Sequence, residues 1–217
     1  MACEQNFAVQ TREAILSSPQ QQAAIRLGEV VAASSTGFLS QCYQLYGAPP
    51  LGSFVKVGTP PVYAVVQNVS TEPLDPSRPV LARGEAAESE EAIYRDNPQI
   101  ARLLTSRFEA VIVGYEGEGT PLQYLPPLPP RVHSFVHAAT PDEVIRFTGQ
   151  LDFLRLLLNT HSPQAPQSDE VVAACLRLTG AMQSEPRQFL LRAGKTLAGE
   201  LAGDLPRLNA IMRRVAL

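Results

Sequence analysis

The chain contains no tryptophan, only three cysteines in 217 residues, and no long uncharged apolar run. Cys3, Cys42 and Cys175 lie far apart, so they form neither a disulfide framework nor a C-x-x-C metal or redox pair. No segment holds the roughly 18 successive apolar residues of a transmembrane helix. Charged and amide side chains within residues 1–15 exclude the hydrophobic region of a signal peptide. We therefore expect a cytoplasmic protein with free thiols and no membrane insertion.

Charge is also scarce. Charged residues make up 18% of the chain, against about 25% in average proteins, and the formal net charge is −3. Such a molecule has no long-range attraction for phosphate backbones or anionic lipid. The densest basic group is Arg207, Arg213 and Arg214, and helix dipoles explain basic residues near a helix C-terminus equally well. Nucleic-acid binding is therefore not expected.

The first half is dominated by short runs of β-branched, small and aromatic residues between glycine and proline turns. Two strands are expected within residues 28–47, two within 53–70, one at 108–116 and a closing strand at 132–138. Valines crowd both faces of the segment 61–69, which is typical of a strand covered on both sides. Short turns between successive strands predict a small antiparallel barrel and exclude a parallel sheet with crossover helices.

An acidic stretch interrupts these strands. Its apolar spacing predicts two short helices near residues 87–105, broken before Pro98. The glutamates Glu88, Glu90 and Glu91 are interpreted as a solvated helix face.

From Thr140 onward the pattern is helical. Thr140-Pro141-Asp142-Glu143 combines an N-cap, a proline at the first helical position and a capping-box glutamate. It predicts a helix to about Asn159, and further helices are expected to begin near 168, 185 and 205. The predicted organisation is an N-terminal arm of short helices (1–27), a β-barrel with a helical insertion (28–138) and a helical region (139–217). The fold class is α+β.

Four segments resemble the HAS-barrel family, the small barrel that precedes the motor of HerA-type hexameric DNA-translocating ATPases and is related to the barrel of rotary ATP synthases. They are GEVVAASSTGFL, PPLGSFVKV, VYAVVQNVS and PPLPPRVHSFV, within residues 28–136. The resemblance implies a barrel that takes part in assembly with an ATPase. Only about 80 residues follow the barrel and they read as helices, so the RecA-like motor of that family does not fit into this chain.

No catalytic, cofactor-binding or metal-binding residue is assigned. Gly194-Lys195-Thr196 matches the end of a phosphate-binding loop, but Phe189 stands where that loop needs its first glycine, so a helix is expected. Gly114–Gly119 carries two glutamates that would repel phosphate, and a hairpin or flexible loop is expected. His133 and His137 on one strand face would lie about 13 Å apart, too far to share a metal ion.

The run Pro126–Arg131 (PPLPPR) allows two interpretations. It could be a polyproline II ligand for an aromatic-lined groove, with Arg131 as the orienting charge. The favoured interpretation is a stiff structural connection into the closing strand.

The leading functional hypothesis is a non-enzymatic interaction or assembly module that docks on itself or on a protein partner such as a hexameric ATPase. The alternative is a nucleic-acid-associated accessory factor, since small barrels can bind strands on an open face. An enzyme whose residues converge only in three dimensions is a third hypothesis.

Overall fold

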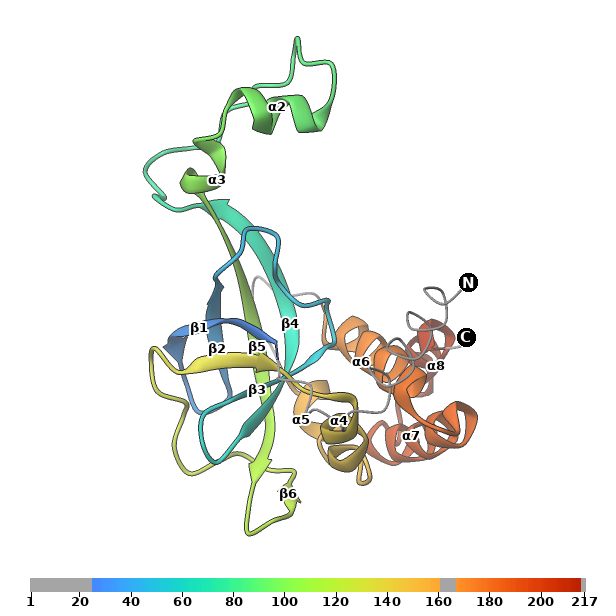
Figure 1. Ribbon diagram of the computed structural model, residues 1–217. Coiled ribbons are helices and arrows are strands. Elements are labelled where there is room, and N and C mark those ends of the chain that lie inside the picture. Colours follow the sequence, from blue (N-terminus) through green and yellow to red (C-terminus); the bar gives the residue numbers. More distant parts are fainter. Residues whose placement is uncertain (1–24, 161–166, 216–217) are drawn as a thin grey trace, which may run out of the picture.

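The structure is a computed structural model that describes residues 25–160 and 167–215. These hold seven strands and seven helices, which confirms the α+β class. The strands lie in the first part of the chain, and a group of helices follows them and packs on one side of the sheet (Figure 1). Residues 1–24 of the predicted N-terminal arm lie outside the described residues. Arg26 and Leu27 already belong to the first strand, so the sheet begins two residues before the predicted boundary at residue 28.

All seven strands pair antiparallel, in the order β2-β1-β7-β3-β4-β5-β6. Because β2 also pairs with β5, six of the strands form a closed circuit of pairings and β6 is added at the side of β5. The strands are β1 (Arg26–Ala33), β2 (Gly37–Cys42), β3 (Phe54–Val57), β4 (Val62–Pro73), β5 (Leu104–Glu116), β6 (Pro121–Leu122) and β7 (Phe135–Ala138).

Strand β4 contributes to two hydrophobic clusters, one on each of its faces. Ala64 and Val66 belong to an inner cluster that has members from all six strands of the circuit. Tyr63 and Val65 belong to an outer cluster shared with the helices. All four side chains are buried, which confirms the expectation that this valine-rich strand is covered on both sides.

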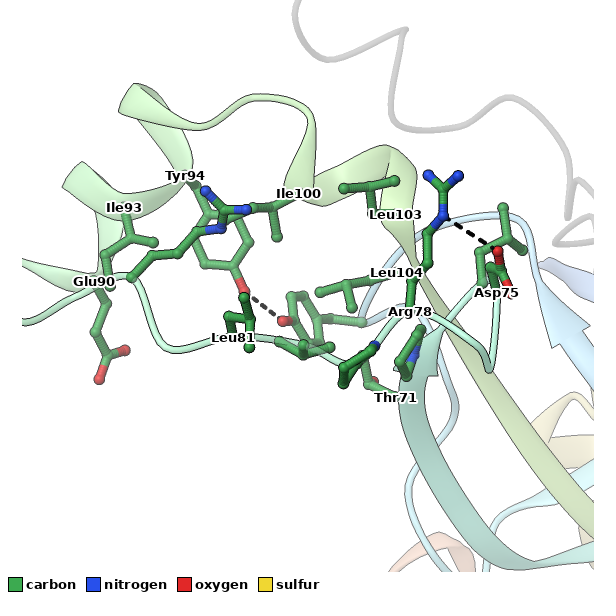
Figure 2. A pocket seen from close by; sticks show the side chains of 16 residues that line it. Thr71, Asp75, Arg78, Leu81, Glu90, Ile93, Tyr94, Ile100, Leu103 and Leu104 are labelled. Carbon is green, nitrogen blue, oxygen red and sulfur yellow. Dashed lines mark hydrogen bonds and ion pairs between the residues drawn. The ribbon is translucent and has the colours of Figure 1, made fainter.

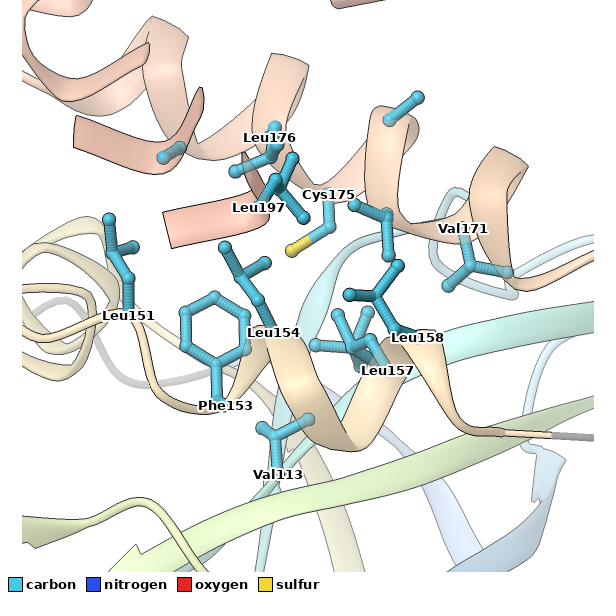
Figure 3. Close-up of a cluster of buried hydrophobic side chains, with 14 of the residues drawn as sticks. Val113, Leu151, Phe153, Leu154, Leu157, Leu158, Val171, Cys175, Leu176 and Leu197 are labelled. Carbon is cyan, nitrogen blue, oxygen red and sulfur yellow. The ribbon is translucent and has the colours of Figure 1, made fainter. Parts of the chain in front are cut away.

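The outer cluster joins the helical region to the sheet. Leu154, Leu157 and Leu158 lie between Val113 of β5 and the helix that carries Cys175 (Figure 3). The helices of this region are α4 (Pro141–Phe147), α5 (Leu154–Leu158), α6 (Ser168–Met182), α7 (Pro186–Glu200) and α8 (Leu205–Val215). Three of the predicted helix starts, near 168, 185 and 205, are thereby confirmed.

The predicted capping box at the start of α4 is present. Thr140 Oγ1 accepts a hydrogen bond from the Glu143 backbone N–H at 3.3 Å, and Glu143 Oε2 accepts one from the Thr140 N–H at 2.9 Å. Glu143 Oε1 also contacts Lys56 Nζ of β3 at 2.5 Å, so the same carboxylate ties the helix start to the sheet. Burial favours a higher pKa for Glu143, but the hydrogen bonds from Lys56 and Thr140 outweigh it and hold the pKa below its ordinary value.

The prediction of one continuous helix from Thr140 to about Asn159 is wrong, because α4 ends at Phe147 and α5 begins at Leu154. The side chain of Gln123 bridges the break. Its Nε2 donates to the carbonyls of Phe147 and Gln150 at 2.6 and 3.0 Å, and its Oε1 accepts from the Phe153 N–H at 3.0 Å. These bonds satisfy backbone groups that a continuous helix would have paired internally.

The closing strand is shorter than predicted. Strand β7 begins at Phe135, and His133 has a φ of 67°, in the left-handed region, within a turn closed by a Ser134 N–H to Arg131 carbonyl bond of 3.1 Å. Val132 and His133 therefore do not alternate on a strand as expected, and Val132 is half exposed.

Between β4 and β5 the chain leaves the sheet to form a segment that we call the insertion (residues 74–103). It contains α2 (Glu90–Asp96) and α3 (Ile100–Leu103), so the expectation of two short helices near 87–105 is confirmed. The insertion projects away from the end of the β4–β5 ladder, on the side away from α7 (Figure 1).

Gly52 provides a stability test of the contact between the sheet and the helices. Its φ is +83°, and an added Cβ would lie 2.5 Å from the Cys175 backbone nitrogen in α6. Alanine at position 52 would be strained in this left-handed backbone conformation, and its Cβ would be overpacked against α6. Gly52→Ala should therefore lower the free energy of unfolding by about 2–5 kcal/mol. Urea unfolding measures this change. Gly199→Ala is the control, because nothing lies near its Cβ position in α7, and an unchanged stability of Gly52→Ala would contradict the tight approach.

Candidate functional site

A cavity lies where the insertion meets the end of the β4–β5 ladder, and we call it the insertion pocket. Its volume is about 700 Å³, and most of the side chains around it are apolar (Figure 2). Its walls come from three stretches of sequence: Tyr46, residues 71–83 and residues 90–104.

The strand ladder and the helix caps position these walls. The pairing of β4 with β5 continues to Pro73 opposite Leu104, and the Leu74 N–H donates to the Leu103 carbonyl at 2.8 Å. Ser89 is the N-cap of helix α2, and its Oγ accepts a hydrogen bond from the Ala92 N–H.

Tyr46 closes one side of the pocket. Its φ of 62° is in the left-handed region, where a non-glycine residue costs about 1–3 kcal/mol. The Tyr46 N–H donates to Ser106 Oγ at 2.8 Å, and the Tyr46 and Tyr94 hydroxyls are 2.5 Å apart (Figure 2). The hydrogen bond to Tyr94, together with burial, raises the pKa of Tyr46 above its ordinary value. The strained backbone thus holds a link between the sheet and α2.

The insertion exposes apolar side chains that the fold does not use. Val80 and Leu81 are 62% and 69% exposed, and no residue of the insertion belongs to either hydrophobic cluster. Exposed apolar surface beside a formed pocket is typical of binding sites. Sequence analysis missed this surface because Val80 and Leu81 lie in a proline-rich stretch with no helix or strand periodicity.

The polar groups around the pocket are partly engaged with one another. Asp75 accepts hydrogen bonds from Ser77 and pairs with Arg78 at 3.4 Å. Within residues 25–160 and 167–215, no three His, Cys, Asp or Glu side chains are grouped to hold a metal ion. The arrangement is suited to binding an apolar group.

The motifs considered in the sequence lie elsewhere. Gly194-Lys195-Thr196 lies within α7, as predicted, and Gly117 and Thr120 form the turn of the β5–β6 hairpin. His133 Nδ1 lies 3.4 Å from Glu29 Oε1 and belongs to no group of three or more possible metal ligands within the described residues. Burial raises the pKa of Cys42 to about 11 and that of Cys175 to about 12, so both thiols are unreactive at neutral pH.

The proline-rich run 126–131 is partly buried, and two of the C-terminal arginines form ion pairs within the fold. In the run between β6 and β7, Pro126 is buried and Leu128 is 77% exposed. Arg207 pairs with Asp169 at 2.8 Å and Arg214 pairs with Glu170 at 2.6 Å. Two of the three arginines that could have formed a basic patch are therefore used to hold α8 against the start of α6.

Among the described residues, none of the helices combines the length and the apolar character that crossing a membrane would require.

Comparison of the chain with models of known protein families and with curated protein sequences found no match.

The position of Lys195 leads to a prediction about nucleotides. A phosphate-binding lysine follows a glycine-rich loop whose backbone N–H groups point at the phosphates, whereas the N–H groups around Lys195 are inside α7. We expect no Mg-dependent ATP hydrolysis by the purified protein in a coupled phosphate-release assay. Hydrolysis that disappears in Lys195→Ala and persists in Arg187→Ala, a cation on the same helix, would contradict this expectation.

Proposed function

We propose that the chain is a non-enzymatic interaction or assembly module, which docks through its insertion onto a second protein surface. The observation that carries this proposal is the insertion pocket with its exposed Val80 and Leu81, which lie outside both hydrophobic clusters. A fold that needed these side chains for its own stability would bury them.

We also propose that the sheet is a small barrel of the HAS type. The closed circuit of six strand pairings and the inner cluster with members from each strand support this. Closure removes most strand edges, so strand addition has few places to occur. Docking through the insertion is therefore favoured over docking through a sheet edge.

The rival function is binding of nucleic acid. Single-strand binders combine a basic groove with aromatic side chains on which bases stack. The insertion carries six acidic residues against four arginines, and its tip, residues 85–91, holds four glutamates and no basic residue. This charge opposes phosphate and favours a protein partner.

A double substitution tests the proposal. Val80→Ser/Leu81→Ser removes exposed apolar area from the insertion and changes no residue of either hydrophobic cluster. Leu128→Ser is the control, because the Leu128 side chain is also exposed but lies outside the insertion, in residues 126–131. Burying one leucine contributes about 1.5–3 kcal/mol, so the double variant should weaken association at least about tenfold. Light scattering after size exclusion, with and without partners captured from the native host, measures the loss.

The same proteins are titrated with labelled single- and double-stranded DNA at low and physiological salt. The proposal predicts weak DNA binding that salt abolishes. Tight DNA binding at physiological salt, together with no protein association by the unmodified chain, would contradict the proposal and favour the rival.

A further inference from the structure

The surface beside the insertion pocket is acidic and its acidic groups lack ionic partners. Glu85, Glu88, Glu90 and Glu91 are exposed, and none forms an ion pair with another described residue. Glu90 also lines the pocket itself.

Most of the insertion's own cations are already engaged. Arg78 pairs with Asp75, Arg95 pairs with Asp96, and Arg83 donates to Asn97 at 3.3 Å. These arginines are therefore held by neighbouring acidic or amide groups. We call these four glutamates the glutamate rim: Glu90 lines the apolar pocket, as do Arg78 and Arg83, and the other three glutamates lie close to Glu90 in the sequence.

The outward face of α7 has the opposite character. Arg187, Leu191 and Lys195 are spaced four residues apart, so they lie in one row on the helix. Leu191 is 60% exposed, and Arg187 and Lys195 are exposed and form no ion pair in the described part of the chain. Phe189, Ala193 and Leu197 on the other face are buried in the outer cluster. The row is thus an apolar side chain between two cations, and neither cation has an ionic partner among residues 25–160 and 167–215.

These two surfaces cannot meet within one molecule. The insertion extends from one end of the sheet, whereas α7 lies among the helices at the other side of the molecule (Figure 1). Contact between them must join two copies. Because different patches meet, the contact is heterologous, and repetition of it closes a ring or extends a filament.

We infer that the partner of the insertion pocket is a second copy of this chain, whose α7 docks on the pocket with Leu191 against the apolar wall and Arg187 and Lys195 against the glutamate rim. The inference rests on the proposed function and specifies the partner. An amphipathic helix lying in an apolar groove is an established mode of recognition. The apolar contact supplies affinity, while the charges at its rim set orientation and increase the association rate.

Charge reversal on each side tests the pairing. Glu85→Arg/Glu88→Arg/Glu91→Arg reverses the sign of the rim's net charge, because only Glu90 remains acidic, and leaves Ser89, the N-cap residue of α2, in place. Arg187→Glu/Lys195→Glu changes the outward row of α7. Like charges then face each other in a homotypic contact, and each variant alone should self-associate at least about tenfold more weakly than the unmodified chain.

An equimolar mixture of the two variants restores opposite charges at both contacts, so it should recover association close to that of the unmodified chain. Arg131→Glu/Arg213→Glu is the matched control, since both arginines are exposed and lie outside both surfaces. Sedimentation velocity measures all samples, and circular dichroism checks that each is folded.

Three results would overturn the inference. The unmodified chain could remain monomeric, each charge-reversal variant alone could self-associate as strongly as the unmodified chain, or the equimolar mixture could fail to recover association. A host protein could still be captured through Val80 and Leu81 when one of these results is obtained. In that case the proposed function as an interaction module is retained, and only the inference that the partner is a second copy of the chain is rejected.

Discussion

Burial of both faces of β4 and β5 is the constraint on which the other parts of the molecule depend. The inward side chains, such as Val66 and Ile112, fill the cluster inside the circuit of strands, and the outward ones, such as Val65 and Val113, require a cover. The helices α4 to α8 provide that cover, and Gly52 allows α6 to approach the sheet closely. Removing water from both faces is the main favourable term in this arrangement.

The same two strands separate the proposed binding surface from the hydrophobic core. Their ladder extends to Pro73 opposite Leu104, where the insertion begins. The insertion contributes to neither hydrophobic cluster, so its side chains can expose apolar surface at little cost to the core. The strained backbone of Tyr46, with its hydroxyl on Tyr94, links this projecting segment to the sheet. The proposed interaction surface, which lies on a separate support, can therefore change without unfolding the sheet.

Local signals in the sequence predicted local structure correctly. The capping box at Thr140 fixed the start of α4, and valines on both faces of β4 indicated a strand covered on both sides. The break after Phe147 was not predictable in this way, because Gln123, which bridges it, is 24 residues earlier in the chain. The insertion pocket was missed for a similar reason: Tyr46 and Tyr94 are 48 residues apart and meet only in the folded molecule.

If the insertion pocket of one copy binds the outward face of α7 of another, as we propose, both surfaces become covered together. Hydrogen exchange followed by mass spectrometry, on the unmodified chain at concentrations below and above its self-association, measures this. Amide protection should then rise at residues 78–94 and 187–195, and stay unchanged at residues 123–134 between β6 and β7. Protection that rises elsewhere, or that leaves the insertion and α7 unchanged while the chain associates, would contradict this contact between copies.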